Sequence, residues 1–424
     1  MKRILWIVNT IFPYPAKMLK IKKTVLGGWL NGLANNLKEQ KDIKLYIATV
    51  YSGKNIKKFD DGKIVYYLIP GAPAIQYDVK LEKYWKQINE ECKPDLVHIH
   101  GTEFTHGLAF LTANPHVKSA VSIQGLVSKI ADVYYANISI NEVIKNITFR
   151  DLIKKDSLIQ QKRKFSKRGK EEIKCIKKAN AIIGRTEWDY SNCKTIKENL
   201  IYYKCNEIIR DEFYKAEKWN DKNMEKHSLY ISQGSYPIKG LHIILKAIAT
   251  LKNEYSDIKL YVSGDNIVKA ESVNERMRLS GYGKYIRNII KKLELSENVI
   301  FTGNLNTKEV INRIQKSNAV IMASIVENES NSISEASLIG TPVICSYVGG
   351  IVDRIENGVN GLTYPFTESA MLANNIRKVF EEEDLVKNIT KNEIEKYSKI
   401  LDKKTNVNRM LEIYNEIITQ RELK

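Results

Sequence analysis

The chain has 424 residues, of which 43% are hydrophobic and 27% are charged. This length suffices for two or three domains with separate cores. Because neither internal repeats nor long low-complexity tracts occur, the sequence excludes a solenoid and a largely disordered protein.

The formal charge of +18 is unevenly distributed along the chain. Residues 1–212 hold 37 Lys and Arg against 22 Asp and Glu, whereas the remaining residues hold 30 against 27. A basic first half suggests an anionic partner there: nucleic acid, an acidic membrane surface or a phosphorylated substrate. The alternative is a general abundance of lysine, which does not account for the asymmetry.

The cysteines and the lengths of the apolar runs indicate in which cellular compartment the protein is expected. The five cysteines are odd in number and form no C-x-x-C pair, which argues against a disulfide framework or a zinc site and fits a reducing cytosol. The apolar run Ile4–Val8 is too short for a signal peptide and predicts a buried first strand. No run of about 18 apolar residues occurs, so we expect no transmembrane helix.

The first half alternates predicted strands and helices. A lysine-rich loop at 10–23 leads to a helix whose first turn contains Gly27 and Gly28, a pair that suggests close approach of a ligand to the backbone. Further strands are predicted at Leu45–Val50, Ile64–Leu68, Asp95–Gly101, Ala120–Gly125 and Ala181–Glu187. Their polar ends, which include Gln124 and Arg185, point to the ligand edge of a parallel sheet.

Two stretches of the first half allow competing interpretations. His98, His100, Glu103 and His106 have the composition of a metal site but fit no standard zinc spacing, so we expect no metal there. Residues 145–178 are strongly basic with a loosely helical apolar face. This face is either a solvated helix surface or a surface for anionic lipid headgroups.

A polar segment at 210–226 predicts the interdomain linker, after which strands and helices alternate again. Strands are predicted at Leu229–Ser232, Leu260–Val262, Val299–Phe301, Val320–Met322 and Pro342–Cys345, and late helices at 283–293, 368–384 and 405–420. Both halves are therefore predicted to be doubly wound α/β domains.

The loop Gly234–Gly240 follows a strand and opens a helix. Its glycines permit a tight turn, and Lys239 stands at the positive end of the helix dipole, where a lysine is unfavourable unless an anion such as a diphosphate binds. The loop lacks the spacing of a Walker A motif. A surface lysine in a turn is the alternative.

Two glutamates, Glu327 and Glu335, stand eight positions apart around the polar segment Asn331-Ser332-Ile333-Ser334. Ser332 and Glu335 have the spacing of a capping box, which is a structural explanation for Glu335. A carboxylate at that position is also suited to accept ribose hydroxyls. Glu327 follows a predicted strand and has no capping role.

These residues resemble those of the retaining glycosyltransferases of family four, also called glycosyl transferases group 1. Glu327 and Glu335 resemble the family's E-x7-E motif, Pro237-Ile238-Lys239-Gly240 its phosphate segment, and Gly27-Gly28 its N-terminal glycine pair. Thr341-Pro342-Val343-Ile344, Gly349-Gly350 and Asn357-Gly358 also match the family pattern. The segments 184–189 and 203–207 are similar to a subgroup of bacterial surface-polysaccharide enzymes.

The resemblance implies a GT-B fold, in which two Rossmann-like domains face each other across a cleft and the last helix crosses back to the first domain. It implies an N-terminal acceptor domain at 1–212 with the crossing helix at 400–424, and a nucleotide-sugar domain at 224–399. No metal or other cofactor is implied. The donor is a UDP- or GDP-linked sugar.

The resemblance also implies roles for individual residues. Glu327 and Lys239 are the expected catalytic residues, Glu327 at the donor sugar and Lys239 at the leaving diphosphate. Expected donor contacts are Gly234, Ser235, Lys239, Glu327, Asn331, Ser332, Ile333 and Glu335, and expected acceptor or phosphate contacts are Gly27, Gly28, Gln124 and Arg185.

Two positions depart from the family pattern. Ser235 stands where an arginine is common, so a second phosphate-binding cation must come from elsewhere or the clamp is weaker. Gln124 stands where a histidine is common, and an amide can position a substrate but cannot act as a base at neutral pH.

The sequence therefore predicts a retaining, metal-independent glycosyltransferase of hexosyltransferase type, active in bacterial surface-polysaccharide synthesis. The expected acceptor is a saccharide that is linked to a lipid. The expected location is the cytoplasm, where the protein could also bind peripherally to the anionic inner face of the membrane. Alternatives are a GT-B sugar-nucleotide epimerase and a basic nucleic-acid or scaffold protein, although no nucleic-acid module is recognised and no nucleic-acid partner is expected.

Overall fold

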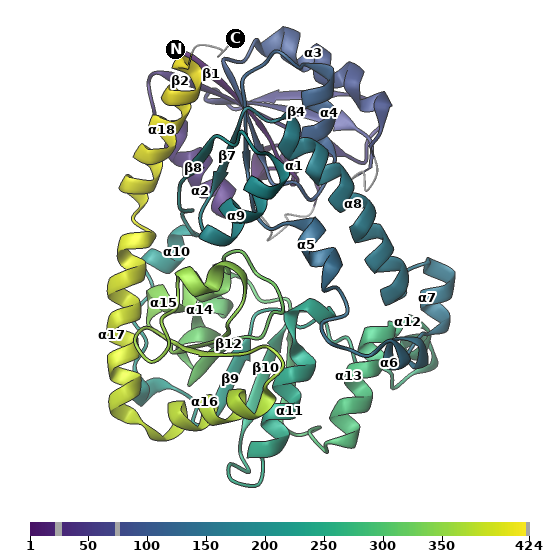
Figure 1. The fold of residues 1–424 in the computed structure, drawn as a ribbon, viewed down its shortest axis with the longest axis vertical. Helices are drawn as coiled ribbons and strands as arrows, with labels where there is room; N and C mark the ends of the chain where they lie inside the picture. The colour runs from purple at the N-terminus through teal and green to yellow at the C-terminus, as the bar shows by residue number, and fades with distance from the viewer. Residues whose placement is uncertain (22–27, 73–76, 421–424) are drawn as a thin grey trace. The chain divides into compact units, whose positions relative to one another are not determined.

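The computed structural model describes residues 1–21, 28–72 and 77–420, and it divides into two compact units (Figure 1). The first unit comprises Met1–Lys129, Lys164–Arg210 and Leu401–Lys424; the second comprises Ile130–Arg163 and Asp211–Ile400. Each unit is built on its own largely parallel sheet, which confirms the predicted fold class of two Rossmann-like α/β domains.

The first sheet has the strand order β3-β4-β2-β1-β5-β6-β7-β8, with only β3 antiparallel to its neighbour. Because the strand order reverses between β1 and β5, the topological switch point lies there. The strands are β1 (Lys2–Ile7), β2 (Ile43–Tyr51), β3 (Lys57–Asp60), β4 (Ile64–Pro70), β5 (Leu96–His100), β6 (Ser119–Ser122), β7 (Ala181–Gly184) and β8 (Tyr202–Lys204).

Helices cover both faces of the first sheet and bury two apolar clusters against it. The helices of the first half are α1 (Pro13–Met18), α2 (Gly28–Leu37), α3 (Glu82–Cys92), α4 (His106–Ala113), α5 (Val127–Asp132), α6 (Ile140–Lys145), α7 (Phe149–Lys154), α8 (Leu158–Lys178) and α9 (Glu187–Ile196). The buried stretch of β1, Ile4–Ile7, is entirely apolar, as expected for a strand covered on both faces, whereas the buried strand β5 also contains His98 and His100.

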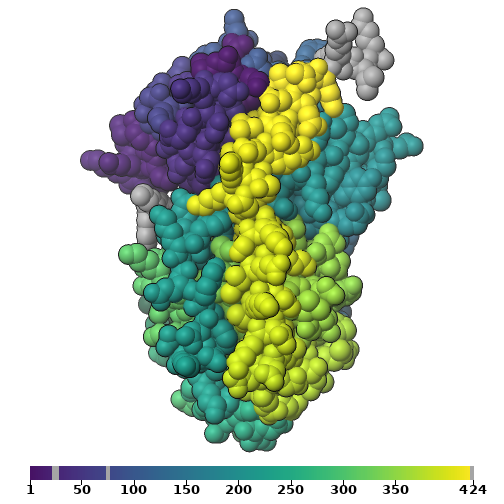
Figure 2. Space-filling view, turned by 90° about the vertical axis from the view of Figure 1, so that its left-hand side faces the viewer, coloured from purple at the N-terminus to yellow at the C-terminus, as the bar shows by residue number. Residues whose placement is uncertain are grey.

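The last helix, α18 (Lys403–Thr419), packs on the first unit beside α2 and β5. Figure 2 shows this yellow segment against the purple N-terminal part of the chain. Its apolar face is buried, and Tyr414 accepts a hydrogen bond from Trp6 Nε1 at 2.9 Å while its hydroxyl lies 2.8 Å from His98 Nδ1. The predicted return of the C-terminal helix to the first domain is confirmed.

The second sheet has the order β11-β10-β9-β12-β13-β14 and is entirely parallel among its named strands. Its switch point lies between β9 and β12. The strands are β9 (Ser228–Ile231), β10 (Lys259–Ser263), β11 (Val299–Gly303), β12 (Ala319–Met322), β13 (Val343–Ser346) and β14 (Leu362–Tyr364). The helices are α10 (Asp211–Tyr214), α11 (Leu241–Leu251), α12 (Val273–Arg278), α13 (Gly281–Lys292), α14 (Thr307–Gln315), α15 (Asn331–Ile339), α16 (Ser369–Glu381) and α17 (Glu383–Ile400).

Residues Ile130–Arg163 belong to the second unit, although the sequence-based division places them in the domain at 1–212. Polar contacts explain their position. The Asp151 carboxylate accepts a hydrogen bond from the Gly281 amide at 2.9 Å, and His242 Nε2 lies 3.0 Å from the Ala136 carbonyl oxygen. Such contacts join residues more than 100 positions apart, so local sequence patterns do not reveal them.

Candidate functional site

The carboxyl edge of the second sheet gathers most of the predicted donor residues. The loops that follow β9 and β12 are neighbours there because these two strands pair in parallel at the switch point. The β9 loop supplies Gly234, Ser235 and Lys239, and the β12 loop supplies Glu327 before α15 begins at Asn331. The topology thus brings together residues that lie almost 90 positions apart.

Lys239 and Glu327 form an ion pair at this edge. The Lys239 Nζ lies 2.6 Å from Glu327 Oε2, and both side chains retain partial exposure to solvent. Burial alone would lower the pKa of the Lys239 ammonium, but the Glu327 carboxylate and Tyr236 outweigh it and hold that pKa above its ordinary value. Lys239 is therefore a fixed cation at neutral pH, and Ser324 Oγ donates a second hydrogen bond to the same Glu327 oxygen at 3.2 Å.

Glycines permit the tight packing of these two loops. Gly240 has a φ of 71°, and a Cβ there would lie 1.8 Å from the Ala323 carbonyl oxygen at the end of β12. Gly349 has a φ of 53°, and its Cβ would lie 1.9 Å from the carbonyl oxygen of Glu327, which also accepts a hydrogen bond from the Gly350 amide at 3.0 Å. The glycines of both motifs thus fix the backbone that presents Lys239 and Glu327.

Glu335 lies one turn inside α15 and is buried. The helix begins at Asn331 with Ser330 as its N-cap, and the Ser330 side chain makes no cap hydrogen bond. The predicted capping box of Ser332 and Glu335 is therefore wrong, because the helix starts two residues earlier than that box requires and Glu335 is too far inside it. The first turn, with Asn331, Ser332 and Ile333, directs backbone N–H groups along the helix axis toward the β12 loop.

Ser235 lines a pocket of about 280 Å³ within the second unit. Its walls include Tyr236 from the same loop, Ser280–Tyr282 at the start of α13, and Asp156 and Gln161 from the segment Ile130–Arg163. The sequence did not reveal this contribution, because it depends on how that segment folds onto the second unit.

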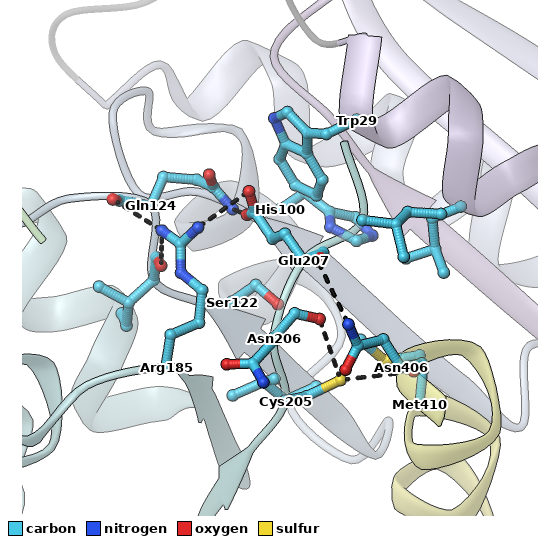
Figure 3. A pocket seen from close by; sticks show the side chains of 14 residues that line it. Trp29, His100, Ser122, Gln124, Arg185, Cys205, Asn206, Glu207, Asn406 and Met410 are labelled. Carbon is cyan, nitrogen blue, oxygen red and sulfur yellow. Dashed lines mark hydrogen bonds and ion pairs between the residues drawn. The ribbon is translucent and has the colours of Figure 1, made fainter. Parts of the chain in front are cut away.

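A second pocket, of about 430 Å³, lies at the carboxyl edge of the first sheet (Figure 3). The ends of β5, β6, β7 and β8 form its floor, and α2 and α18 contribute side walls. Its polar and aromatic lining consists of Trp29, His100, Ser122, Gln124, Arg185, Asn206, Glu207 and Asn406. Two predicted acceptor residues, Gln124 and Arg185, are thus part of one pocket.

Glu207 connects Gln124 and Arg185. Arg185 Nη1 forms an ion pair with Glu207 Oε2 at 2.8 Å, and Gln124 Nε2 donates to Glu207 Oε1 at 2.8 Å. Arg185 Nη2 also donates to the Gln124 carbonyl oxygen at 3.2 Å. The arginine is buried, so its charge is largely balanced inside the protein. The sequence pointed to Glu207 only as part of the segment 203–207.

His100 lines the same pocket and is buried. Burial, and then the neighbouring His98, hold the pKa of its imidazole well below the ordinary value, so the ring is neutral. Neither ring nitrogen has a hydrogen-bond partner among the residues that the structure describes. Trp29 lies beside it, with the ring centroids 5.7 Å apart. A neutral imidazole and an indole suit an uncharged polar ligand such as a saccharide.

The structure describes only one of the two glycines, Gly27 and Gly28, that were predicted to contact acceptor or phosphate. Gly27 lies outside the described residues. Gly28 is the first residue of α2 and does not line the pocket, although Trp29 does. A Cβ on Gly28 would lie 2.7 Å from Arg210 Cγ, so packing inside the first unit already calls for a glycine.

His98, which lies within β5, is structural in its contacts. His98 Nε2 lies 2.7 Å from Ser122 Oγ, and burial lowers the pKa of His98 to about 3. Within residues 1–21, 28–72 and 77–420, no three His, Cys, Asp or Glu side chains are arranged to hold a metal ion. In the same ranges, no helix has the length and apolar character needed to cross a membrane.

Comparisons with known proteins show what the chain is similar to. Residues 212–396 match the family described as "Glycosyl transferases group 1". An uncharacterized glycosyltransferase of Methanocaldococcus jannaschii is 25% identical over 179 residues, which are 41% of this chain and 42% of that protein. A D-inositol 3-phosphate glycosyltransferase of Corynebacterium urealyticum is 24% identical over 35% of this chain and 33% of its own length. The matches thus span less than half of these relatives.

Solved structures are similar over nearly the whole chain. The sucrose-phosphate synthase of Thermosynechococcus elongatus has a TM-score of 0.67 at 14% identity and covers 98% of this chain and 99% of its own. Anabaena HepE, solved in complex with UDP-glucose, has a TM-score of 0.66 at 16% identity, with 98% and 100% covered. The chain therefore shares the two-domain fold of these solved glycosyltransferase structures, and its residues 212–396 are similar to the glycosyl transferases group 1 family.

Proposed function

We propose that the protein transfers a sugar from a UDP- or GDP-linked donor to a saccharide acceptor, with retention of anomeric configuration and without a metal ion. The observation that carries the proposal is the Lys239–Glu327 ion pair at the switch point of the second sheet. The Lys239 ammonium and the Glu327 carboxylate already contact each other. A cation for the diphosphate and a carboxylate for the sugar therefore lie close enough to bind adjacent parts of one donor molecule.

In this proposal Lys239 exchanges its partner when the donor binds. Its ammonium turns from Glu327 to the diphosphate, while the freed Glu327 carboxylate accepts hydrogen bonds from the donor sugar. The N–H groups of Asn331 and Ser332 at the start of α15 complete the phosphate contacts, and Glu335 holds the ribose hydroxyls. Fixed donors of this kind stabilise the charge that develops on the leaving diphosphate.

The absence of an arginine at Ser235 makes Lys239 the main side-chain cation of the phosphate loop in this proposal. Gly234 supports the loop, because a Cβ there would lie 2.8 Å from Val262 Cγ1. The loop can therefore present its backbone closely to a phosphate, while Ser235 contributes a hydroxyl. Catalysis then depends more strongly on Lys239 than it would with two side-chain cations.

The acceptor is proposed to occupy the first-unit pocket. Trp29 offers an apolar surface for a sugar ring, and His100 and Gln124 offer polar atoms for its hydroxyls. TarM of Staphylococcus aureus, which shares the fold at a TM-score of 0.64, was solved with UDP, fondaparinux and an α-GlcNAc-glycerol ligand. We infer a lipid-linked saccharide in bacterial surface-polysaccharide synthesis, at the cytoplasmic face of an anionic membrane, from the excess of cations in residues 1–212.

The test is a donor panel read by thermal shift and by release of nucleoside diphosphate. We expect one nucleotide sugar to raise the melting temperature, and diphosphate release to require a saccharide acceptor and to persist in EDTA. NMR of the product should show the donor's anomeric configuration. Isomerisation of the donor without acceptor would instead indicate an epimerase, and salt-sensitive binding of DNA or RNA without donor binding would indicate a nucleic-acid protein.

A further inference from the structure

Three short helices of the second unit, α6, α7 and α12, expose apolar side chains. Helix α7 exposes Phe149, Leu152 and Ile153, of which 69%, 61% and 66% of the surface is accessible. Helix α12 packs against α7, and α6 packs against α13 (Figure 1). Exposed pairs on these neighbours, Ile140 with Ile144 and Val273 with Met277, extend the surface. We call these seven side chains the apolar patch.

The polarity of α7 is the reverse of that of an ordinary surface helix. Phe149, Leu152 and Ile153 are spaced i, i+3 and i+4, so they lie on one face. The opposite face buries Asp151, which is 1% accessible and bonds to the Gly281 amide at 2.9 Å. Leaving a large apolar side chain in water forgoes the stabilisation that its burial would give. A helix that buries its carboxylate and exposes three such side chains is built for a partner on its outer side.

Charge identifies the chemistry of that partner. Exposed cations lie on or directly after all three helices: Lys145 on α6, Lys154 and Lys155 at the end of α7, and Arg276 and Arg278 on α12. The acidic residues of α6 and α12 have partners of their own, since Glu142 accepts a hydrogen bond from Asn146 and Glu275 pairs with Lys269. The acidic groups of α7 and its following turn are engaged, because Arg150 pairs with both Asp151 and Asp156. Apolar side chains surrounded by lysine and arginine match a lipid surface with anionic headgroups.

The same charges disfavour a second copy of the chain as the occupant. A symmetric dimer through this face would bring the cations of one copy close to those of the other, and like charges across an interface are unfavourable. An anionic bilayer satisfies both features at once, since apolar side chains enter the headgroup boundary while the cations contact phosphates.

We propose that the apolar patch on α6, α7 and α12 is the surface through which this protein docks on an anionic membrane. The assignment deepens the membrane association included in the proposed function and places the contact on the segment that joins the second unit. Docking there would hold the nucleotide-sugar domain at the surface where a lipid-linked acceptor resides.

The test compares flotation of the full chain with phosphatidylcholine vesicles and with vesicles that also contain phosphatidylglycerol. We expect binding to the anionic vesicles, and at least a tenfold loss of bound protein for the triple variant Phe149→Ser, Leu152→Ser and Ile153→Ser. The matched control, Val359→Ser with Met371→Ser, replaces exposed apolar residues elsewhere in the second unit and should bind like the wild type. Lys154→Glu with Lys155→Glu should weaken binding to anionic vesicles.

The outcomes separate the alternatives. Equal binding by the triple variant and the wild type, or no binding by the wild type, would overturn the proposal. A wild type that is dimeric in sedimentation velocity, with a monomeric triple variant and no vesicle binding, would assign the patch to a second copy. Flotation does not use sugar transfer, so failure of the donor assay with intact vesicle binding would contradict only the proposed function.

Discussion

The carboxyl edges of the two parallel sheets differ in how they use charge. In the second unit Lys239 and Glu327 meet at the surface of the switch point and keep partial exposure. In the first unit Arg185 and Glu207 form the corresponding close pair, but both side chains are nearly inaccessible. A partly exposed pair can exchange partners with a ligand, whereas a buried pair mainly supports the shape of its pocket.

This difference changes the interpretation of the basic first half. The pocket of the first unit contains one arginine and one glutamate, together with neutral side chains, so its own lining carries no excess of charge. The cations that make residues 1–212 basic lie elsewhere, and part of them border the apolar patch of the second unit. Net charge per stretch of sequence therefore does not locate an anion site.

The largest expected effect breaks the buried pair. Arg185→Ala leaves the Glu207 carboxylate without its cation, and removal of one partner from a buried pair typically costs 3–5 kcal/mol, so about 4 kcal/mol of unfolding free energy should be lost. Urea denaturation measures the loss. Lys399→Ala, which removes a cation from an exposed pair, is the control and should leave the midpoint unchanged. A stable Arg185→Ala protein would show that the pair does not hold the pocket together.

The partly exposed pair should respond in the opposite way. Lys239→Ala should reduce kcat about a hundredfold, or roughly 3 kcal/mol of transition-state stabilisation, because a fixed cation at the leaving diphosphate is lost. The melting temperature should change little. Lys246→Ala, on the exposed face of the helix that follows, is the matched control for a lost lysine. Near-normal kcat in purified Lys239→Ala would contradict the role proposed for Lys239.

Acid should weaken the anchoring of Ile130–Arg163 to the second unit. Burial lowers the pKa of His242 from its ordinary value of 6.5 to about 4, although its contact with the Ala136 carbonyl opposes the shift. The unfolded chain thus takes up this proton first as the pH falls. His242 contributes stability that is complete above pH 6.5 and is lost toward pH 4, by about 3 kcal/mol.

Denaturation midpoints of the wild type and of His242→Gln between pH 7.5 and pH 4.5 would measure this contribution. The glutamine variant can still donate a hydrogen bond but takes up no proton, so its stability should fall less steeply over that range. An equal fall of the denaturation midpoint with pH in both proteins would show that His242 does not cause the loss of stability in acid.

The smallest expected effect concerns the first-unit pocket. His100→Phe keeps a ring of similar shape but removes both nitrogens, and loss of one hydrogen bond to a neutral group costs about 1.4 kcal/mol or roughly tenfold in affinity. We expect KM for the saccharide acceptor to rise about tenfold while KM for the donor stays unchanged. An increase in the donor KM alone would place the acceptor elsewhere.

Much of the architecture was accessible from local patterns. Apolar runs of five or six residues followed by polar ends located most strands to within about two residues, because fully buried parallel strands leave a strong signal. The strands β3, β8 and β14 were missed, since they have three or four residues and include polar ones. The predicted capping box was also wrong: α15 starts after Ser330, whose side chain makes no cap hydrogen bond, so side-chain capping does not set this helix start.

The sequence by itself determined the two doubly wound domains and pointed to Lys239, Glu327 and the glycines that support them. Local spacing is enough to identify these residues, because the strand, the loop and the start of the next helix follow each other directly along the chain. Only the tertiary structure decided that Lys239 contacts Glu327, that Glu207 balances Arg185, and that residues 130–163 join the second unit. These outcomes depend on contacts between residues more than 20 and up to about 140 positions apart, whose pairing is set by strand order and packing.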